Sequence, residues 1–360
     1  PSAQIANNPW GTFEYVHFSL EQPDTYLPDS ERKLVTPRWF FEGYSQDQLL
    51  EFLNSAGLTA EQKTRLMNPG QWEISANGIY VSPSRDVIRS LSRPSRQTVY
   101  SVLGQSNVNL AHRYPFRCRV DGFEQWFERS NLSQEKLDLV RNLTVTNGQS
   151  LCLVDIDLVQ DALTPEEFKG VFRRLYSEPS LLALLKVARG EEVSRLIKYW
   201  GRNGRENSVA PILKSLAKDG GTLNVSQLLP PFARLRLYTF VPPTDGSNGP
   251  QEDCFWAAMN FFNEKPDPSL LNLQTAIQRL KTDYVSTPEK ALGDILVLSD
   301  KSNRTLHACV YIADDVVFTK NGTDYMEPFV LMKMRDVLAK YETEGGLHVV
   351  TLRSKKLIPQ

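Results

Sequence analysis

The chain has 360 residues, of which 41% are hydrophobic, enough for two domains with apolar cores. Its 41 basic and 42 acidic residues nearly balance, so there is no electrostatic reason to expect nucleic acid or an anionic membrane as a partner. The richest apolar run, Leu181 to Ala188, is interrupted by Lys186 and is too short for a membrane span. The four cysteines and four histidines lack the spacing of metal ligands, so we expect no metal and no other cofactor.

The first part of the chain predicts a mainly helical domain. Residues 1–43 are rich in aromatic side chains and prolines with little periodicity, and we expect an irregular segment over a core. Ser45 with Gln48 and Thr59 with Gln62 have the spacing of capping boxes, which predicts a helix after each pair. Further helices are expected at 84–103 with a break at Pro94, from 165, and at 179–188, 191–199 and 209–217, and one strand at 151–156.

Glycines and prolines cluster between residues 220 and 231, and we place the domain boundary there. The prediction is a helical domain of unknown role at 1–230 and a second domain at 231–360. In the second domain we expect strands at 295–299, 306–312, 316–320 and 348–352, and helices at 254–263, 270–281 and 328–341. Helices with a small antiparallel sheet predict an α+β fold.

Cys254 carries the most specific chemical signal in the chain. It follows Asp253 and begins an apolar helix, where the helix-start amides and the helix dipole lower a thiol's pKa. His307 lies in a predicted strand later in the sequence and could act as the base for a cysteine nucleophile. Because the neighbours Ala308 and Val310 alternate with it, we expect His307 on the less aliphatic face of the sheet, with the cysteine helix against that face.

A third residue would orient the imidazole, and the hairpin after His307 offers three candidates. A three-residue loop places Asn321 opposite His307 and Thr319 opposite Cys309, whereas a two-residue loop brings Lys320 to the histidine face. We choose Asn321, because its amide oxygen can accept the imidazole N–H as in a Cys-His-Asn triad. Thr319 and Lys320 stay open as alternatives.

The oxyanion formed on attack would need hydrogen-bond donors. The backbone N–H of Cys254 is the first, and Gln251 or Tyr238 could supply the second. Asp253, next to the nucleophile, is a further candidate for a contact with the substrate. None of these positions calls for a metal.

The pattern around these residues resembles that of a known family. Asp253-Cys254 at a helix start, Gly293-Asp294 opening a strand, and the His-x-x-x-Tyr-Ile strand from His307 are similar to NlpC-type cysteine peptidases, which have a trimmed papain-like fold. The resemblance covers residues 235–355. It implies Cys254 as nucleophile, His307 as base, and a peptide bond of bacterial peptidoglycan as the substrate. Because the family is generally exported and the chain begins with Pro1 instead of Met, we expect a periplasmic or extracellular protein.

The resulting prediction is an amide hydrolase, a peptidase or amidase, that acts through a thioester on Cys254 with His307 as base. Two features depart from the family: Phe255-Trp256 stand where Ser-Gly is usual, and no second histidine occupies the position of the third residue. They keep two alternatives open. One is an acyltransferase or thioesterase on the same scaffold, for which Phe255 and Trp256 suggest an apolar acyl group. The other is a non-catalytic binding or interaction protein that retains the fold.

Overall fold

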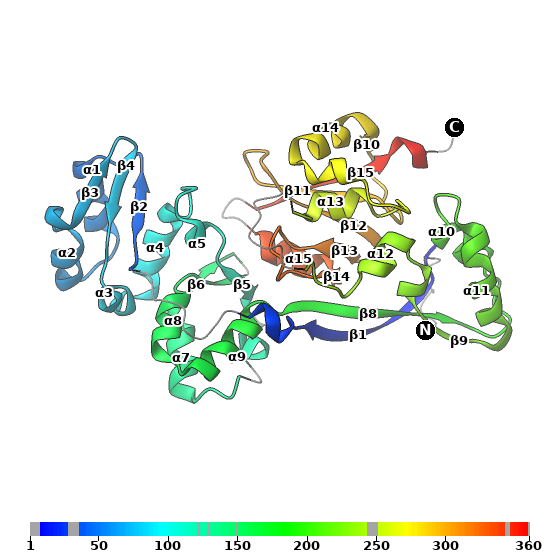
Figure 1. Ribbon diagram of the computed structural model, residues 1–360, viewed down its shortest axis with the longest axis horizontal. Coiled ribbons are helices and arrows are strands. Elements are labelled where there is room, and N and C mark those ends of the chain that lie inside the picture. Colours follow the sequence, from blue (N-terminus) through cyan, green and yellow to red (C-terminus); the bar gives the residue numbers. More distant parts are fainter. Residues whose placement is uncertain are drawn as a thin grey trace, which may run out of the picture. The chain divides into compact units, whose positions relative to one another are not determined.

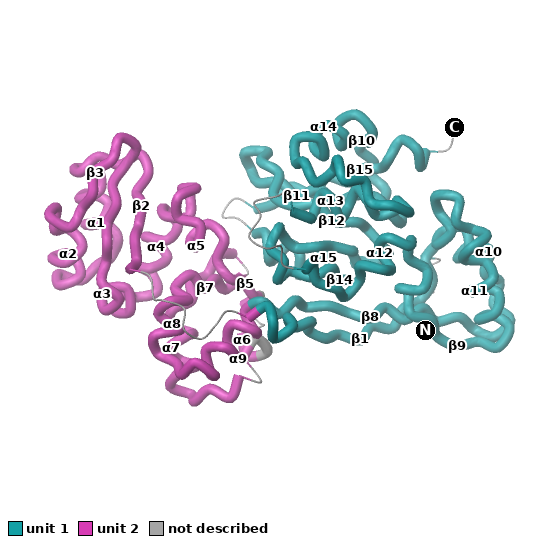
Figure 2. Tube along the Cα trace, in the orientation of Figure 1, with its two compact units in different colours: residues 1–26, 176–360 teal, residues 27–175 magenta. Residues whose placement is uncertain are grey.

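The computed structural model describes residues 8–27, 36–120, 123–127, 130–148, 150–242, 251–342 and 346–358. It is a mixed α+β structure in which all sheets are small and antiparallel. The chain forms two compact units, shown in Figure 2: unit 1 holds residues 1–26 and 176–360, and unit 2 holds residues 27–175. This division does not coincide with the boundary that we expected at residue 230.

Unit 2 combines short helices with two three-stranded sheets, in the orders β2-β4-β3 and β5-β7-β6 (Figure 1). Both predicted capping boxes are present, with reciprocal side-chain bonds between Ser45 and Gln48 and between Thr59 and Gln62. The main elements are β2 (Trp39–Glu42), α1 (Gln46–Ser55), α2 (Ala60–Leu66), β3 (Trp72–Ser75), β4 (Gly78–Val81), α3 (Arg85–Ser90), α4 (Arg93–Leu103), α5 (Leu110–Arg113), β5 (Phe116–Arg119), α6 (Phe123–Phe127), α7 (Gln134–Leu143), β6 (Thr144–Asn147), β7 (Ser150–Leu153), α8 (Ile156–Ala162) and α9 (Pro165–Leu175).

Unit 1 begins with a long two-stranded ribbon. Strand β1 (Thr12–Leu20) pairs antiparallel with β8 (Glu178–Val187) along its whole length, and β9 (Gly221–Asn224) adds a third strand (Figure 1). The irregular segment predicted for residues 1–43 therefore contains a strand, and the helix predicted for residues 179–188 is wrong. The helices α10 (Ser194–Trp200), α11 (Glu206–Asp219) and α12 (Pro231–Arg236) belong to the same unit.

A six-stranded antiparallel sheet forms the rest of unit 1, in the order β10-β15-β11-β12-β13-β14. The helix predicted for residues 328–341 starts instead with a strand, β14, because Phe329 to Lys333 pair with β13. The elements are β10 (Tyr284–Ser286), β11 (Ile295–Ser299), β12 (Thr305–Ala313), β13 (Val316–Lys320), β14 (Phe329–Lys333) and β15 (His348–Ser354), with helices α13 (Cys254–Met259), α14 (Leu273–Asp283) and α15 (Met334–Tyr341).

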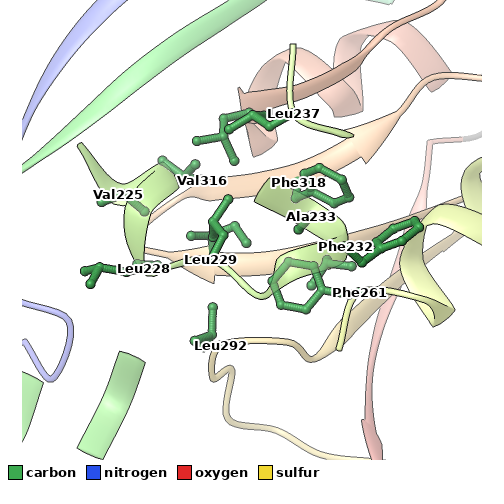
Figure 3. Close-up of a cluster of buried hydrophobic side chains, with 14 of the residues drawn as sticks. Val225, Leu228, Leu229, Phe232, Ala233, Leu237, Phe261, Leu292, Val316 and Phe318 are labelled. Carbon is green, nitrogen blue, oxygen red and sulfur yellow. The ribbon is translucent and has the colours of Figure 1, made fainter. Parts of the chain in front are cut away.

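The core of unit 1 explains why the division does not fall at residue 230. Figure 3 shows side chains of the segment from Val225 to Leu237 beside Val316 and Phe318 of β13, and all of these are buried. Burying each aliphatic or aromatic side chain of this kind contributes about 1.5–3 kcal/mol to stability. In addition, Ser180 Oγ of β8 donates to the Leu331 carbonyl of β14 at 3.0 Å. Residues on both sides of position 230 thus share one core.

Candidate active site

Cys254 is the first residue of α13, as its sequence context predicts. The Asp253 carboxylate caps the helix by accepting the Trp256 backbone N–H at 2.7 Å. All six residues of α13 are buried, so the helix packs on every side. The backbone N–H groups of Ala308 and Phe255 are near enough to the sulfur to lower the pKa of the thiol, and Ala308 directly follows His307 in β12. The thiol and the histidine strand are therefore neighbours.

His307 is fully buried in β12. Its Nε2 lies 2.8 Å from Thr319 Oγ1, and its ring stacks on Tyr341 of α15 with 4.2 Å between the ring centroids. Within the described part of the chain, its Nδ1 has no hydrogen-bond partner. One ring nitrogen is thus held by a side chain, and the other keeps its bonding capacity unused.

The structure corrects the expectation about the faces of the sheet. Helix α13 packs in the core that contains Ala308, Val310 and Ile312, the aliphatic face of β12. The His307 ring projects to the other face, which α15 covers. The physical reason is that α13 is apolar all around and buries most surface against aliphatic side chains. Among the described residues no hydrogen bond joins Cys254 to His307.

The ladder between β12 and β13 ends before it reaches His307. The pairing of β12 with β13 runs from Ala313↔Val316 to Val310↔Phe318, and His307 lies three residues beyond its end. A continuous ladder at this place would separate the two faces with hydrogen-bonded backbone. Beyond the ladder the backbone N–H of Ala308 is instead directed to the Cys254 sulfur.

Thr319, not Asn321, contacts the imidazole. The loop between the strands has two residues, because Ala313 pairs with Val316, and a register shift before Ala313 gives the pairing Val310↔Phe318 that the three-residue loop predicted. The ladder ends there, so Asn321 and His307 are not paired. Instead, Asn321 Oδ1 accepts the Thr319 hydroxyl at 3.3 Å, and Thr319 Oγ1 reaches Nε2. Lys320 belongs to the Cys254 side, where its charge lowers the thiol's pKa, and its ammonium donates to the carbonyls of Gly322 and Asp324.

Neither side chain expected to donate to the oxyanion is directed to the Cys254 sulfur. The Tyr238 hydroxyl donates to the Leu181 carbonyl at 2.7 Å, so it is not directed to the thiol. Gln251 is exposed, and the Asp253 carboxylate accepts the Trp256 backbone N–H at the N-terminus of α13. Of the described groups, the backbone N–H of Phe255 at the start of α13 and that of Ala308 in β12 act on the sulfur.

Burial keeps both side chains neutral. Removal from water and, as a smaller cause, the Asp253 charge together raise the pKa of the Cys254 thiol to about 12, although the nearby N–H groups and Lys320 oppose this. Burial, with the Lys340 charge as a second cause, lowers the pKa of His307 to about 3. At neutral pH the resting site therefore holds a thiol and an uncharged imidazole.

Sequence reasoning missed a polar network under the imidazole. Asn321 Nδ2 donates to Glu178 Oε2 at 3.1 Å, and Lys340 of α15 bonds to Glu178 and, at 3.0 Å, to Glu327. Glu178 comes from β8, a segment that the sequence assigned to another domain. No pattern in the neighbouring sequence indicates this role of Glu178, because only the tertiary structure brings its side chain to the face of the sheet that carries His307.

Two surface hollows lie away from the candidate site. One is lined by residues between Glu42 and Gly78, and the other by residues between Gly190 and Lys218. Neither is lined by Cys254 or His307, so the candidate site is closed in this structure. The described residues also contain no group of three or more His, Cys, Asp or Glu side chains placed to hold a metal ion.

Membrane-spanning segments and relatives give no further information on the site. Where the structure is described, none of its helices combines the length and the apolar character needed to cross a bilayer. Comparison of the chain with models of protein families, with curated proteins and with solved structures found no match.

Proposed function

We propose that unit 1 is a cysteine hydrolase, a peptidase or amidase, with Cys254 as nucleophile and His307 as base. One observation carries the proposal. The Cys254 thiol lies at a helix start near the backbone N–H of Ala308, and the residue before Ala308 in β12 is His307, whose Nε2 is held by Thr319 and whose Nδ1 is unbonded among the described residues. This is the set of parts that a cysteine nucleophile requires: a thiol at helix-start amides, a base, and a group that orients the base.

The reaction would begin with a change in the closed site. Admission of a substrate would have to be accompanied by a rearrangement of β12 that brings His307 Nδ1 from the α15 face to the Cys254 sulfur, and the thiol would then transfer its proton to the imidazole. The Cys254 thiolate attacks the amide carbonyl, and backbone N–H groups at the start of α13 stabilise the oxyanion. His307 returns the proton to the leaving amine, a thioester forms, and a water activated by His307 hydrolyses it.

The substrate class rests on the resemblance to NlpC-type peptidases. We propose peptide amides of the kind found in bacterial peptidoglycan, and with them an exported location and a papain-like fold for unit 1. Phe255 and Trp256 belong to α13 and are buried in the core. They are therefore not placed to line a binding site for an apolar acyl group, and a thioesterase has less support than an amide hydrolase.

A non-catalytic binding protein is the second candidate, and burial favours it. Cys254 is 7% exposed and His307 is 0% exposed, and their pKa values are shifted away from the thiolate and imidazolium forms. A papain-like domain that had lost its activity could keep both residues as parts of its core.

Hydrolysis of soluble peptidoglycan peptides, followed by mass spectrometry of the released fragments, separates the two candidates. The test compares the unmodified chain with Cys254→Ala and with Cys309→Ala, a matched control because Cys309 is also buried in unit 1 but lies on the other face of β12. The hydrolase predicts fragments from the unmodified chain and the control but none from Cys254→Ala. Absence of fragments from all three proteins, or equal amounts from all three, would contradict it.

A further inference from the structure

A chain of four hydrogen bonds leads from His307 to the partly buried ion pair of Glu178 and Lys340. His307 Nε2 lies 2.8 Å from Thr319 Oγ1, the Thr319 hydroxyl donates to Asn321 Oδ1 at 3.3 Å, and Asn321 Nδ2 donates to Glu178 Oε2 at 3.1 Å. The other oxygen of Glu178 accepts from Lys340. All five side chains except that of Lys340 are at most 4% exposed, so water does not compete for these bonds.

The Glu178 carboxylate determines which group donates and which accepts in each of these hydrogen bonds. An ionised carboxylate can only accept, so Glu178 must receive an N–H of the Asn321 amide. The amide oxygen then faces Thr319 and can only accept the hydroxyl proton. With its proton committed to Asn321, Thr319 Oγ1 can only accept from the imidazole, which places the imidazole proton on Nε2. Nδ1 is left with its lone pair.

The amide orientation has independent support. Asn321 Nδ2 also lies 3.0 Å from the sulfur of Met332, a weak acceptor that suits an N–H donor. The reverse orientation would place the amide oxygen against the Glu178 carboxylate, where two acceptors would face each other. Lys340 fixes the carboxylate from the opposite side and is itself shared with Glu327.

We propose that Glu178 is a positioning residue that sets the tautomer of His307 through Asn321 and Thr319. The consequence for catalysis, a basic Nδ1 available to the Cys254 thiol, rests on the proposed function, whereas the tautomer itself does not. Glu178 lies in β8, which pairs with β1, so the ribbon of unit 1 supplies a residue to the candidate site. This gives the ribbon a role beyond packing.

The substitution Glu178→Gln makes a directional test. The Lys340 ammonium attracts the amide oxygen of the introduced glutamine more strongly than Asn321 does, because a charge-assisted bond is the stronger one. The glutamine would then direct its NH₂ group to Asn321, whose amide would turn over and donate to Thr319. Thr319 would donate to Nε2, and the imidazole proton would move to Nδ1. The tautomer should therefore invert.

The experiment is ¹⁵N NMR of the histidine rings at neutral pH in the full chain labelled at histidine. Only four histidines are present, so single substitutions assign the signals. We expect a protonated Nε2 in the unmodified chain and a protonated Nδ1 in Glu178→Gln. The matched control is Glu327→Gln, which changes another carboxylate on Lys340 that does not bond to Asn321, and should leave Nε2 protonated. Equal tautomers in the unmodified chain and Glu178→Gln would overturn the proposal.

A second variant keeps the test decisive if Glu178→Gln does not fold. Thr319→Val cuts the chain next to the imidazole, so His307 should lose its preference for a protonated Nε2. An unchanged tautomer in Thr319→Val would also overturn the proposal. Alkylation of Cys254 in the same proteins tests the function separately: an inverted tautomer with unchanged Cys254 reactivity would support the Glu178 relay and remove His307 as the base.

Discussion

The buried imidazole of His307 should make the stability of unit 1 depend on pH. Its pKa falls from 6.5 to about 3 on folding, because burial and the Lys340 charge disfavour the imidazolium. The unfolded chain therefore binds the proton more tightly than the folded one. The stabilising contribution is complete above the unfolded pKa and is lost as the pH falls from about 6.5 towards about 3. Linkage gives a loss of about 2 kcal/mol between pH 7 and pH 5.

Urea unfolding followed by circular dichroism at the two pH values measures this loss, with His307→Gln as the comparison. The replacement side chain cannot be protonated but can still donate to Thr319. The variant's own change in stability cancels when each protein is compared with itself at the two pH values. Titrating groups present in both proteins, including the buried His112 of unit 2, cancel as well. A difference between the two proteins below about 0.5 kcal/mol would refute the argument, because His307 would then not be a buried neutral base.

Three further substitutions test the packing around the site by thermal or chemical unfolding. Asp253→Ala removes the cap of α13 and should cost about 1 kcal/mol, whereas Asp253→Asn should cost little, and equal losses would contradict the capping role. Asp294→Ala leaves Arg202 and Arg353 without their shared buried carboxylate and should cost about 3–5 kcal/mol; a loss below about 1 kcal/mol would contradict it. Gly293 has a φ of +86°, and an added Cβ would lie 2.0 Å from the Phe262 ring. Gly293→Ala should therefore clearly lower the melting temperature, and an unchanged melting temperature would contradict this steric argument.

Elements with a local signal could be predicted from the sequence. Ser45 and Gln48 form the expected capping box, and Asp253 caps α13 as its place before an apolar helix indicates. The strands at Ile295–Ser299 and Val316–Lys320 have the predicted bounds. In each case the information lies within a few residues: a cap and its partner, or a short β-branched run between turn residues.

Elements whose identity depends on a distant partner could not be predicted. The apolar runs in β8 and β14 are compatible with a buried helix or a buried strand, and periodicity alone does not separate the two. β8 is a strand because β1, which precedes the whole of unit 2 in the sequence, supplies its hydrogen-bond partner. β14 is a strand because it pairs with β13.

The candidate site divides in the same way. The helix start identifies Cys254, and the alternation of the strand places His307 on the less aliphatic face. The choice of Asn321 over Thr319 assumed that the β12–β13 ladder continues to His307, whereas it ends at Val310↔Phe318, and the Thr319 side chain reaches the imidazole instead. Glu178 had no signal at all, since its position depends on the pairing of β8 with the N-terminal strand.

Activation of Cys254 by His307 is the central claim, and the pH dependence of Cys254 alkylation by iodoacetamide tests it most directly. Peptide mapping isolates the rate at Cys254 from those at the other cysteines. Because the resting site is closed, the rate reports the open form, and the account predicts an inflection well below the free-thiol pKa of about 8.5 that rises in His307→Ala. A rate that increases only above about pH 8.5 and is the same in both proteins would contradict the account.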